Sequence, residues 1–225
     1  MPGGATLQAG DIHHVWDVFL LAAIGVAGIV YILIFWCIVR YRRRSEALPP
    51  QFHHHAVVET ACTVTALLIV AGLFALSYGA EARIERLDPR PAATVRVTGF
   101  DWSWRFEYAG GGPTVTGTPE HPPVLVVPVG RPVHIQITSA DVDHAFFVPA
   151  FLFKRDAIPG LLSHFDLVVT RPGMYRGECA EFCGLDHAAM NFTVSAVTPQ
   201  AYQQWLRERR TAGPPGPAAS GVENP

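Results

Sequence analysis

The sequence predicts a hairpin of two membrane-spanning helices followed by an all-β sandwich domain. Two long runs of the chain, residues 18–39 and 60–80, are apolar and contain no charged side chain. From residue 93 to residue 197 the pattern changes to short segments rich in Val, Ile, Phe and Trp, which Gly and Pro separate. These two patterns are typical of a membrane anchor and of a sandwich of short strands, respectively.

The anchor is expected to cross the membrane twice. Residues 1–17 contain neither Lys nor Arg, unlike the start of a cleaved signal peptide, so we expect them to remain as an outer N-terminal segment. The run 18–39 would span about 33 Å as a helix, enough to cross a bilayer. The arginines of the segment Arg40–Arg44 follow it, and the positive-inside rule places that loop in the cytoplasm. The run 60–80 then returns the chain to the outer side.

The remaining segments follow in order. Residues 81–92 are charged and contain proline, which favours a linker between the anchor and the domain at residues 93–197. Thr198 and Pro199 are typical of a helix start, and a short helix is expected over residues 198–210. The last residues, 211–225, are rich in Gly, Pro and Ala and are predicted to be disordered. The candidate strands are residues 94–98, 102–108, 124–128, 133–138, 165–169, 173–178 and 190–195.

Composition excludes some functions. The net charge is only −2, which is not the balance of a nucleic-acid binder. Two of the four cysteines lie in the apolar runs and two in one short motif, so a disulfide framework is not indicated. The arginine-rich composition fits an integral protein of a bacterial plasma membrane.

The motif at residues 179–190 carries the chemistry. It places Cys179, Cys183, His187 and Met190 within twelve residues, and thiolate, imidazole and thioether donors together favour copper. A mononuclear blue-copper site needs only one thiolate, so two thiolates four residues apart could bridge a pair of copper ions. A further donor must come from elsewhere, and His144, expected just after a strand, is the best candidate.

Simpler interpretations stay open. Cys179 and Cys183 could form a disulfide, since the outer compartment is oxidising, although their spacing does not match a C-x-x-C redox motif. His134 and His164 are interpreted as ordinary polar positions of the β domain. Glu59, at the start of the second apolar run, could be an interfacial carboxylate that the helix dipole stabilises or a group that takes up protons.

In its copper-type motif and in several other segments, the chain resembles subunit II of cytochrome c oxidase. The segments DVDHAFFVP, FKRDAIPG and RPGMYRGECAEFCGLDHAAM, from residue 141 onward, resemble that family's binuclear copper (CuA) domain. The run GFDWSWRF at residues 99–106 resembles its tryptophan-rich strand, and Val58-Glu59-Thr60 resembles the opening of its second helix. The resemblance covers roughly residues 15–208 and implies a cupredoxin-like, Greek-key sandwich on the outer side.

The resemblance also implies roles for single residues. Cys179 and Cys183 would bridge two coppers; His144 and Met190 would bind one of them, and His187 with the backbone carbonyl of Glu181 the other. The carboxylate of Glu181 would reach a magnesium ion at the interface with subunit I.

Two further residues match functional positions of the family. Trp102 would receive electrons from cytochrome c, although a core tryptophan on a strand would look the same. Glu59 would stand at the mouth of a proton pathway into subunit I. The implied partners are subunit I, which would carry the haems and reduce oxygen to water with proton pumping, and also subunit III, cytochrome c and membrane lipid.

Three other functions compete with the one that the resemblance implies. A nitrous oxide reductase would need a large additional domain, and the related quinol oxidases lack the copper ligands. A membrane-anchored protein that binds or delivers copper remains the alternative function. No C-x-x-C-H haem-attachment motif occurs, so a separate electron donor is required. Ala61 and Cys62 stand where the family often has a tryptophan, which leaves the local helix packing open.

Overall fold

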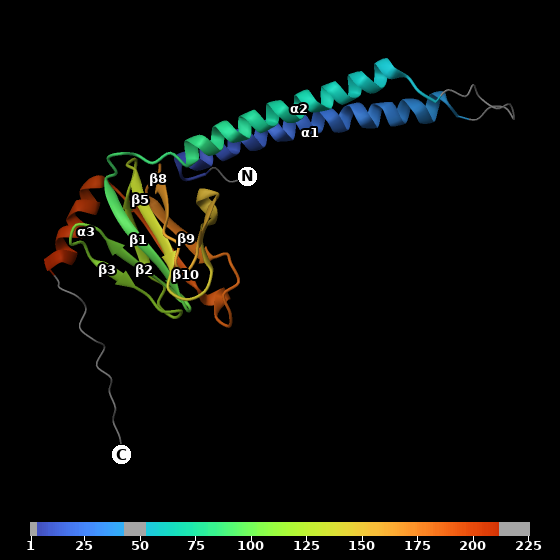
Figure 1. The fold of residues 1–225 in the computed structure, drawn as a ribbon. Helices are drawn as coiled ribbons and strands as arrows, with labels where there is room; N and C mark the ends of the chain where they lie inside the picture. Colours follow the sequence, from blue (N-terminus) through green and yellow to red (C-terminus); the bar gives the residue numbers. More distant parts are fainter. Residues whose placement is uncertain (1–3, 43–52, 212–225) are drawn as a thin grey trace. The chain divides into compact units, whose positions relative to one another are not determined.

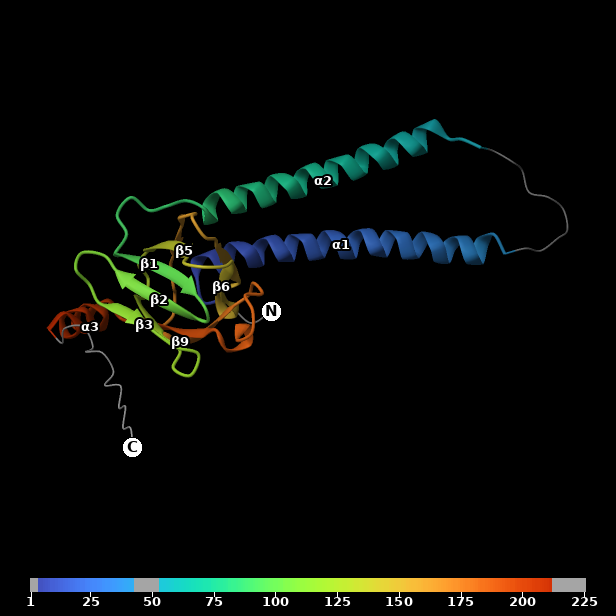
Figure 2. The same cartoon turned by 60° about the horizontal axis from the view of Figure 1, so that its bottom comes forward.

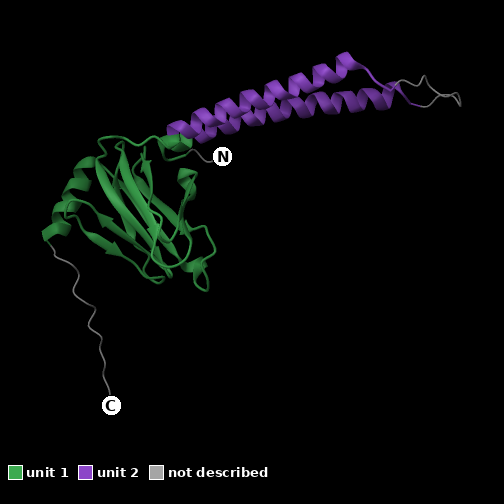
Figure 3. Cartoon of the chain, viewed as in Figure 1, with its two compact units in different colours: residues 1–10, 84–225 green, residues 11–83 purple. Residues whose placement is uncertain are grey.

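The computed structural model describes residues 4–42 and 53–211, in two compact units (Figure 3). One unit comprises residues 11–83, and the other comprises residues 1–10 together with residues 84–225. The loop residues Arg43 and Arg44 and nearly all of the predicted tail fall outside the described ranges. Each unit is therefore described by itself.

Two long helices make up the unit at residues 11–83, apart from the first four residues of one helix and the last residue of the other. Helix α1 spans Leu7–Arg40 and helix α2 spans Ala56–Ile84. Both are long and apolar enough to cross a membrane, and no residue in the apolar window of either helix is buried in the isolated chain. Such exposure is what lipid-facing helices require, because hydrocarbon takes the place of a protein core.

Both helices are longer than the apolar runs that predict them. Helix α1 begins eleven residues before the first run, within the predicted outer segment, because Thr6 caps it by accepting a hydrogen bond from the backbone N–H of Ala9 at 3.1 Å. Helix α2 continues through Ile84 into the predicted linker. Hydropathy marks the part of a helix that can lie in lipid, whereas capping decides where the helix begins.

The second unit is a β-sandwich (Figure 1). The first sheet has the order β3-β2-β1-β5-β8 and the second the order β4-β10-β9-β6-β7. Neighbouring strands are antiparallel except for the pairs β1–β5 and β4–β10. The strands are β1 (Ala93–Phe100), β2 (Ser103–Tyr108), β3 (Thr114–Thr116), β4 (Val124–Pro128), β5 (Val133–Ser139), β6 (His144–Val148), β7 (Phe153–Ala157), β8 (Ser163–Leu167), β9 (Gly173–Cys179) and β10 (Asn191–Val197).

An aromatic cluster fills the space between the sheets. Trp104 from β2 packs edge-to-face on Phe146 from β6 and Phe192 from β10, with ring centroids 6.1 and 5.4 Å apart. Phe146 and Phe192 stack on each other at 4.5 Å. All three side chains are fully buried, and such contacts contribute beyond the area that they bury. The cluster therefore packs β2 of the first sheet against β6 and β10 of the second.

The sequence predicts seven of these strands and misses β3, β6 and β7. The segment before β6, Asp141-Val142-Asp143, has the composition of a turn, and the strand that follows it is only five residues long. His144 follows the end of β5 at Ser139 by five residues, as predicted, and it is also the first residue of β6. Helix α3 spans Pro199–Thr211, close to the prediction, and Thr198 Oγ1 accepts a hydrogen bond from the Ala201 N–H at 3.3 Å.

Candidate metal centre

Strand ends bring the predicted donors together. Strand β9 ends at Cys179 and strand β6 begins at His144, and the two strands pair through Phe146 and Cys179 (Figure 2). The N–H of Cys179 donates to the carbonyl of Met190 at 3.0 Å, and the N–H of Ala180 donates to the carbonyl of Ala145 at 3.1 Å. These bonds fix both ends of the loop that carries the cysteines.

The loop from Ala180 to Met190 is shaped by its own backbone. A short 3-10 helix spans His187–Ala189, and the N–H of Met190 donates to the carbonyl of His187. Gly184 has a φ of +116°, a conformation that side-chain-bearing residues rarely adopt. The loop therefore curls back so that its donors point to one place.

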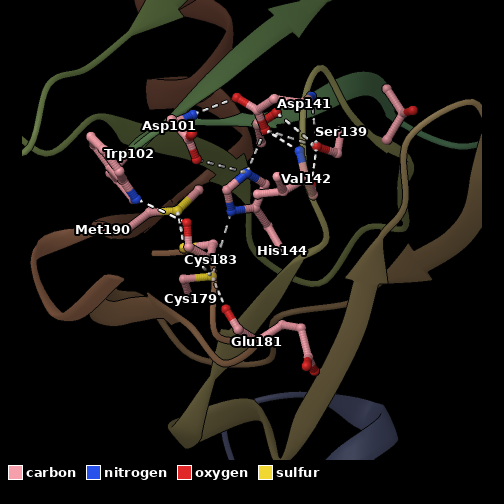
Figure 4. Close-up of polar contacts among 12 residues, drawn as sticks. Asp101, Trp102, Ser139, Asp141, Val142, His144, Cys179, Glu181, Cys183 and Met190 are labelled. Atoms are coloured by element: carbon pink, nitrogen blue, oxygen red, sulfur yellow. Dashed lines mark hydrogen bonds and ion pairs between the residues drawn. The ribbon is translucent and has the colours of Figure 1, made fainter. Parts of the chain in front are cut away.

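The soft donors form one continuous series of contacts, and Figure 4 labels most of them. The sulfur atoms of Cys179 and Cys183 lie 3.9 Å apart. Cys179 Sγ is 3.9 Å from His144 Nδ1 and 3.2 Å from the carbonyl oxygen of Glu181. Cys183 Sγ is 3.5 Å from His187 Nδ1 and 3.8 Å from Met190 Sδ. The structure thus brings together all six donors that the sequence singles out.

This donor set fits a soft metal. Both cysteines are free, and their sulfur–sulfur distance of 3.9 Å is far longer than a disulfide bond of about 2.05 Å. One ion can still touch both sulfurs, because a thiolate binds zinc at about 2.3 Å. Nδ1 of His144 and the two sulfurs lie within 4.8 Å of one another. Cys179 and Cys183 therefore do not form a disulfide in this structure.

The centre is shielded from water. His144 and Met190 are fully buried, and the two cysteines are 6% and 7% exposed. Among the donors that act through their side chains, His187 alone is partly exposed. Buried sulfur and imidazole groups need partners, and here they are partners of one another, as expected for a preorganised metal site.

Two carboxylates lie near Nε2 of His144, the ring nitrogen that does not face the cysteines. Nε2 of His144 lies 2.8 Å from Asp141 Oδ1 and 3.9 Å from Asp101 Oδ1. Asp141 is itself fixed, since its other oxygen accepts the backbone N–H of Asp101 at 2.7 Å and Ser139 Oγ lies 3.3 Å from Oδ1. A carboxylate behind an imidazole fixes the ring orientation and tautomer, as around many metal sites. Sequence reasoning missed this role of Asp141, although its position three residues before His144 is a usable signal.

The same contacts set the acidity of the site. Burial alone would raise the pKa of the Cys179 thiol, but hydrogen bonds from His144 and from the backbone at Ala145 outweigh it and lower that pKa to about 7. Burial, and then the neighbouring Cys179, raise the pKa of Cys183. The pair therefore loses its first proton at Cys179, and a metal must displace the second from Cys183.

Trp102 and Glu181 flank the centre differently. The indole N–H of Trp102, which is partly buried, donates to the backbone carbonyl of Cys183 at 3.0 Å. The carboxylate of Glu181 is exposed and lies 3.3 Å from Lys154 Nζ. Trp102 is thus bonded directly to the loop that carries the cysteines, whereas the Glu181 side chain points away from the sulfurs (Figure 4).

Glu59 lies in the other unit, in the first turn of α2. Its carboxylate accepts the backbone N–H of His55 at 2.9 Å and lies 3.4 Å from His54 Nδ1. These exposed contacts stabilise the start of the helix.

Replacing Gly99 with alanine is expected to weaken copper binding about 10- to 100-fold, the range seen when an outer-shell support of a metal ligand is lost. A Cβ atom at Gly99 would lie 2.9 Å from His144 Cδ2 and 3.1 Å from its Cγ, so the ring must move. Copper titration of the full chain in detergent measures the effect. Gly72→Ala, whose Cβ meets no atom within 4 Å, is the control. Equal copper affinity in Gly99→Ala and the unmodified chain would contradict this account.

The fold and the site together define a class: a two-pass membrane protein whose cupredoxin-like domain gathers soft donors that could hold a metal. A family model described as "Cytochrome C oxidase subunit II, periplasmic domain" matches residues 120–197, and one described as "Cytochrome C oxidase subunit II, transmembrane domain" matches residues 1–78. The chain belongs to the cytochrome c oxidase subunit II family, and its role is that of an oxidase subunit.

Individual relatives agree with this assignment. The chain is 33% identical to a probable cytochrome c oxidase subunit 2 of Streptomyces avermitilis, over 99% of this chain and 82% of the relative. It is 32% identical to cytochrome c oxidase subunit 2 of Cereibacter sphaeroides, over 93% of this chain and 81% of the relative. The crystal structure of the periplasmic domain of subunit II of cytochrome oxidase of Bradyrhizobium japonicum superposes with a TM-score of 0.51 at 32% identity, covering 56% of this chain and 99% of that one.

Proposed function

We propose that this chain receives electrons from a cytochrome c at a binuclear CuA centre and passes them to the haem of oxidase subunit I, where oxygen is reduced to water with proton pumping. The single observation that carries the proposal is the pair of free cysteine sulfurs 3.9 Å apart, with two imidazoles and a thioether around them. A mononuclear site would leave the second thiolate without a role.

Six donors would hold the metal. His144 and Met190 would bind one copper, His187 and the carbonyl of Glu181 the other, and the two cysteines would bridge them. When bound, such a thiolate-bridged pair supplies a one-electron carrier whose charge is shared between two ions. The chain's own contribution is rigidity, since strands β6, β9 and β10 fix both ends of the loop and Asp141 fixes the His144 ring. A rigid donor set keeps the reorganisation on electron transfer small.

The surface near the centre suits a basic donor. Trp102 is hydrogen-bonded to Cys183 and partly exposed, so it offers an aromatic contact one hydrogen bond away from a ligand. Acidic side chains surround the region and would attract a basic cytochrome c over long range, with strong dependence on salt. They are Asp101, Asp141, Asp143, Glu178, Glu181 and Asp186.

The magnesium site, the proton pathway and the contacts with other subunits would exist only in the assembled oxidase. Magnesium at the Glu181 carboxylate requires Lys154 to leave its ion pair with Glu181, which is exposed and therefore contributes at most about 1 kcal/mol. Glu59 would accept protons at the cytoplasmic side, with the N-terminus and the copper domain on the outer face of a bacterial plasma membrane. Subunit I, and also subunit III, would cover part of this chain.

The alternative, a copper-delivery protein, makes a different prediction. A delivery protein must release copper to a chelator, whereas fully buried His144 and Met190 favour retention. Copper that remains bound in the presence of a competing chelator supports the electron-transfer role. Rapid release would favour delivery.

Replacing Trp102 with phenylalanine is expected to slow reduction of the copper-loaded chain by reduced cytochrome c at least about tenfold, equal to about 1.4 kcal/mol in the barrier. The physical reason is the loss of the N–H bond to Cys183, with little change at the ligands. Stopped-flow absorption measures the rate, and an unchanged copper spectrum shows that the centre is intact. Trp205→Phe is the control, since Trp205 packs on Tyr108. An unchanged rate in Trp102→Phe would remove Trp102 from the electron path.

A further inference from the structure

A second group of imidazoles lies in the sandwich, outside the copper loop. His134 is in β5, and His164 and Asp166 are in β8. The two strands are antiparallel, and His134 pairs with Asp166 across them. Alternation along the strands turns Ile135 and Phe165 into the core, so the three polar side chains share the opposite face of the first sheet. The sequence analysis interpreted both histidines as ordinary polar positions.

These side chains form one connected chain of contacts. His134 Nδ1 lies 2.8 Å from Asp166 Oδ1, and His134 Nε2 lies 3.1 Å from His164 Nδ1. The two rings stack with centroids 5.3 Å apart and planes at 22°. A carboxylate only accepts, so His134 donates to Asp166 through Nδ1, and in its neutral form its Nε2 directs a lone pair toward His164.

The carboxylate at the base of this group is held in place. Asp166 is 4% exposed, and its second oxygen accepts the backbone N–H of Asp88 at 2.5 Å. The backbone carbonyl of Asp166 accepts the side-chain amide of Gln8 at 3.0 Å. Asp166, which is itself held in place, therefore fixes the orientation of the His134 ring. The His164 ring is exposed and free to adjust.

We propose that His134 and His164 form a binding site for a divalent transition-metal ion of the zinc class, separate from the copper centre. Imidazole nitrogen binds zinc at about 2.0–2.1 Å, so two nitrogens 3.1 Å apart can both reach one ion. A carboxylate that accepts the other N–H of a ligating histidine is the usual support of such sites, and Asp166 is in that position. Water would fill the remaining positions, since His164 faces solvent.

Binding requires one proton to move. His164 donates its Nδ1 proton to His134 in the metal-free chain, and the ion takes its place. The His164 ring can carry its proton on Nε2 instead, so both imidazoles stay neutral and no net proton is released. The ion would then connect β8, which stands at the end of its sheet, to β5.

The test counts zinc on the full chain in detergent, after copper loading, by equilibrium dialysis. The unmodified chain is expected to bind one more Zn²⁺ than His164→Ala, and His121→Ala is the matched control, since His121 is also an exposed histidine of this unit. His164 is exposed, so its replacement should change the folding free energy by no more than about 0.5 kcal/mol. Equal zinc counts in His164→Ala and the unmodified chain, or an equal loss in His121→Ala, would overturn the proposal.

A second readout locates the ion. Diethylpyrocarbonate modifies accessible histidine nitrogens, and peptide mass spectrometry reports each site. Zn²⁺ is expected to protect His164 at least about tenfold and to leave His121 unprotected, because a coordinated nitrogen has no free lone pair. Equal modification of His164 with and without zinc would show that the pair is a hydrogen-bonded cross-strand contact only. Neither readout depends on electron transfer, so the proposal can fail while the copper function stands.

Discussion

Replacing Cys183 with serine is expected to abolish the binuclear centre. Cys183 Sγ lies at the centre of the loop's donors, within 3.9 Å of the sulfurs of Cys179 and Met190 and of His187 Nδ1. A hydroxyl is a harder donor that does not bridge soft metals. We expect copper to fall from two ions to one per chain and electron transfer from cytochrome c to fall more than about 100-fold, beyond the range for loss of an outer-shell residue.

Metal analysis and stopped-flow reduction of the full chain measure these two effects. Cys62→Ser is the matched control, since Cys62 is a free cysteine in helix α2 and should leave both measurements unchanged. Two coppers per chain with normal electron transfer in Cys183→Ser would mean that the second thiolate is not a bridge.

Replacing Trp104 with alanine is expected to cost about 3–5 kcal/mol of folding free energy. Trp104 is fully buried and touches His144, Phe146 and Phe192, with ring centroids 6.1, 6.1 and 5.4 Å away. A domain has only about 5–15 kcal/mol in total, so the sandwich should be close to unfolding and the His144 side of the site should loosen with it.

Denaturant unfolding of the full chain, followed by near-ultraviolet circular dichroism, measures this loss. Trp104→Phe is expected to lose less than half as much, because the Trp104 indole N–H has no hydrogen-bond partner among the described residues and phenylalanine keeps the ring contacts. Trp36→Ala, on the exposed surface of α1, should change the stability of the sandwich little. A Trp104→Ala chain as stable as the unmodified one would contradict the proposed role of the aromatic cluster.

Local sequence signals predicted the parts of this protein that depend on local chemistry. The two apolar runs predicted both helices, and the spacing of Cys179, Cys183, His187 and Met190 within one loop was visible directly. Helix ends were predicted less well at the N-terminus, where Thr6 caps α1 before the hydropathy rises.

Contacts between distant segments could not be predicted from local patterns. His144 stands 35 residues before Cys179, and only the pairing of β6 with β9 brings its ring to the cysteines. The turn-like composition before His144 hid the strand that begins there. Likewise His134 and His164 are 30 residues apart and meet through the register of β5 and β8. The sequence already indicated His144 as the further donor, but the carboxylate behind it and the close approach of Gly99 emerged only from the packing.

Electron paramagnetic resonance of the copper-loaded, mildly oxidised full chain tests the central claim most directly. If Cys179 and Cys183 bridge two coppers, the unpaired electron is shared, and the spectrum should show hyperfine structure from two equivalent copper nuclei. A spectrum from a single copper nucleus, or a silent protein after oxidation, would contradict the binuclear centre. The chain would then hold copper by a mononuclear site and would fit copper binding or delivery better than electron transfer.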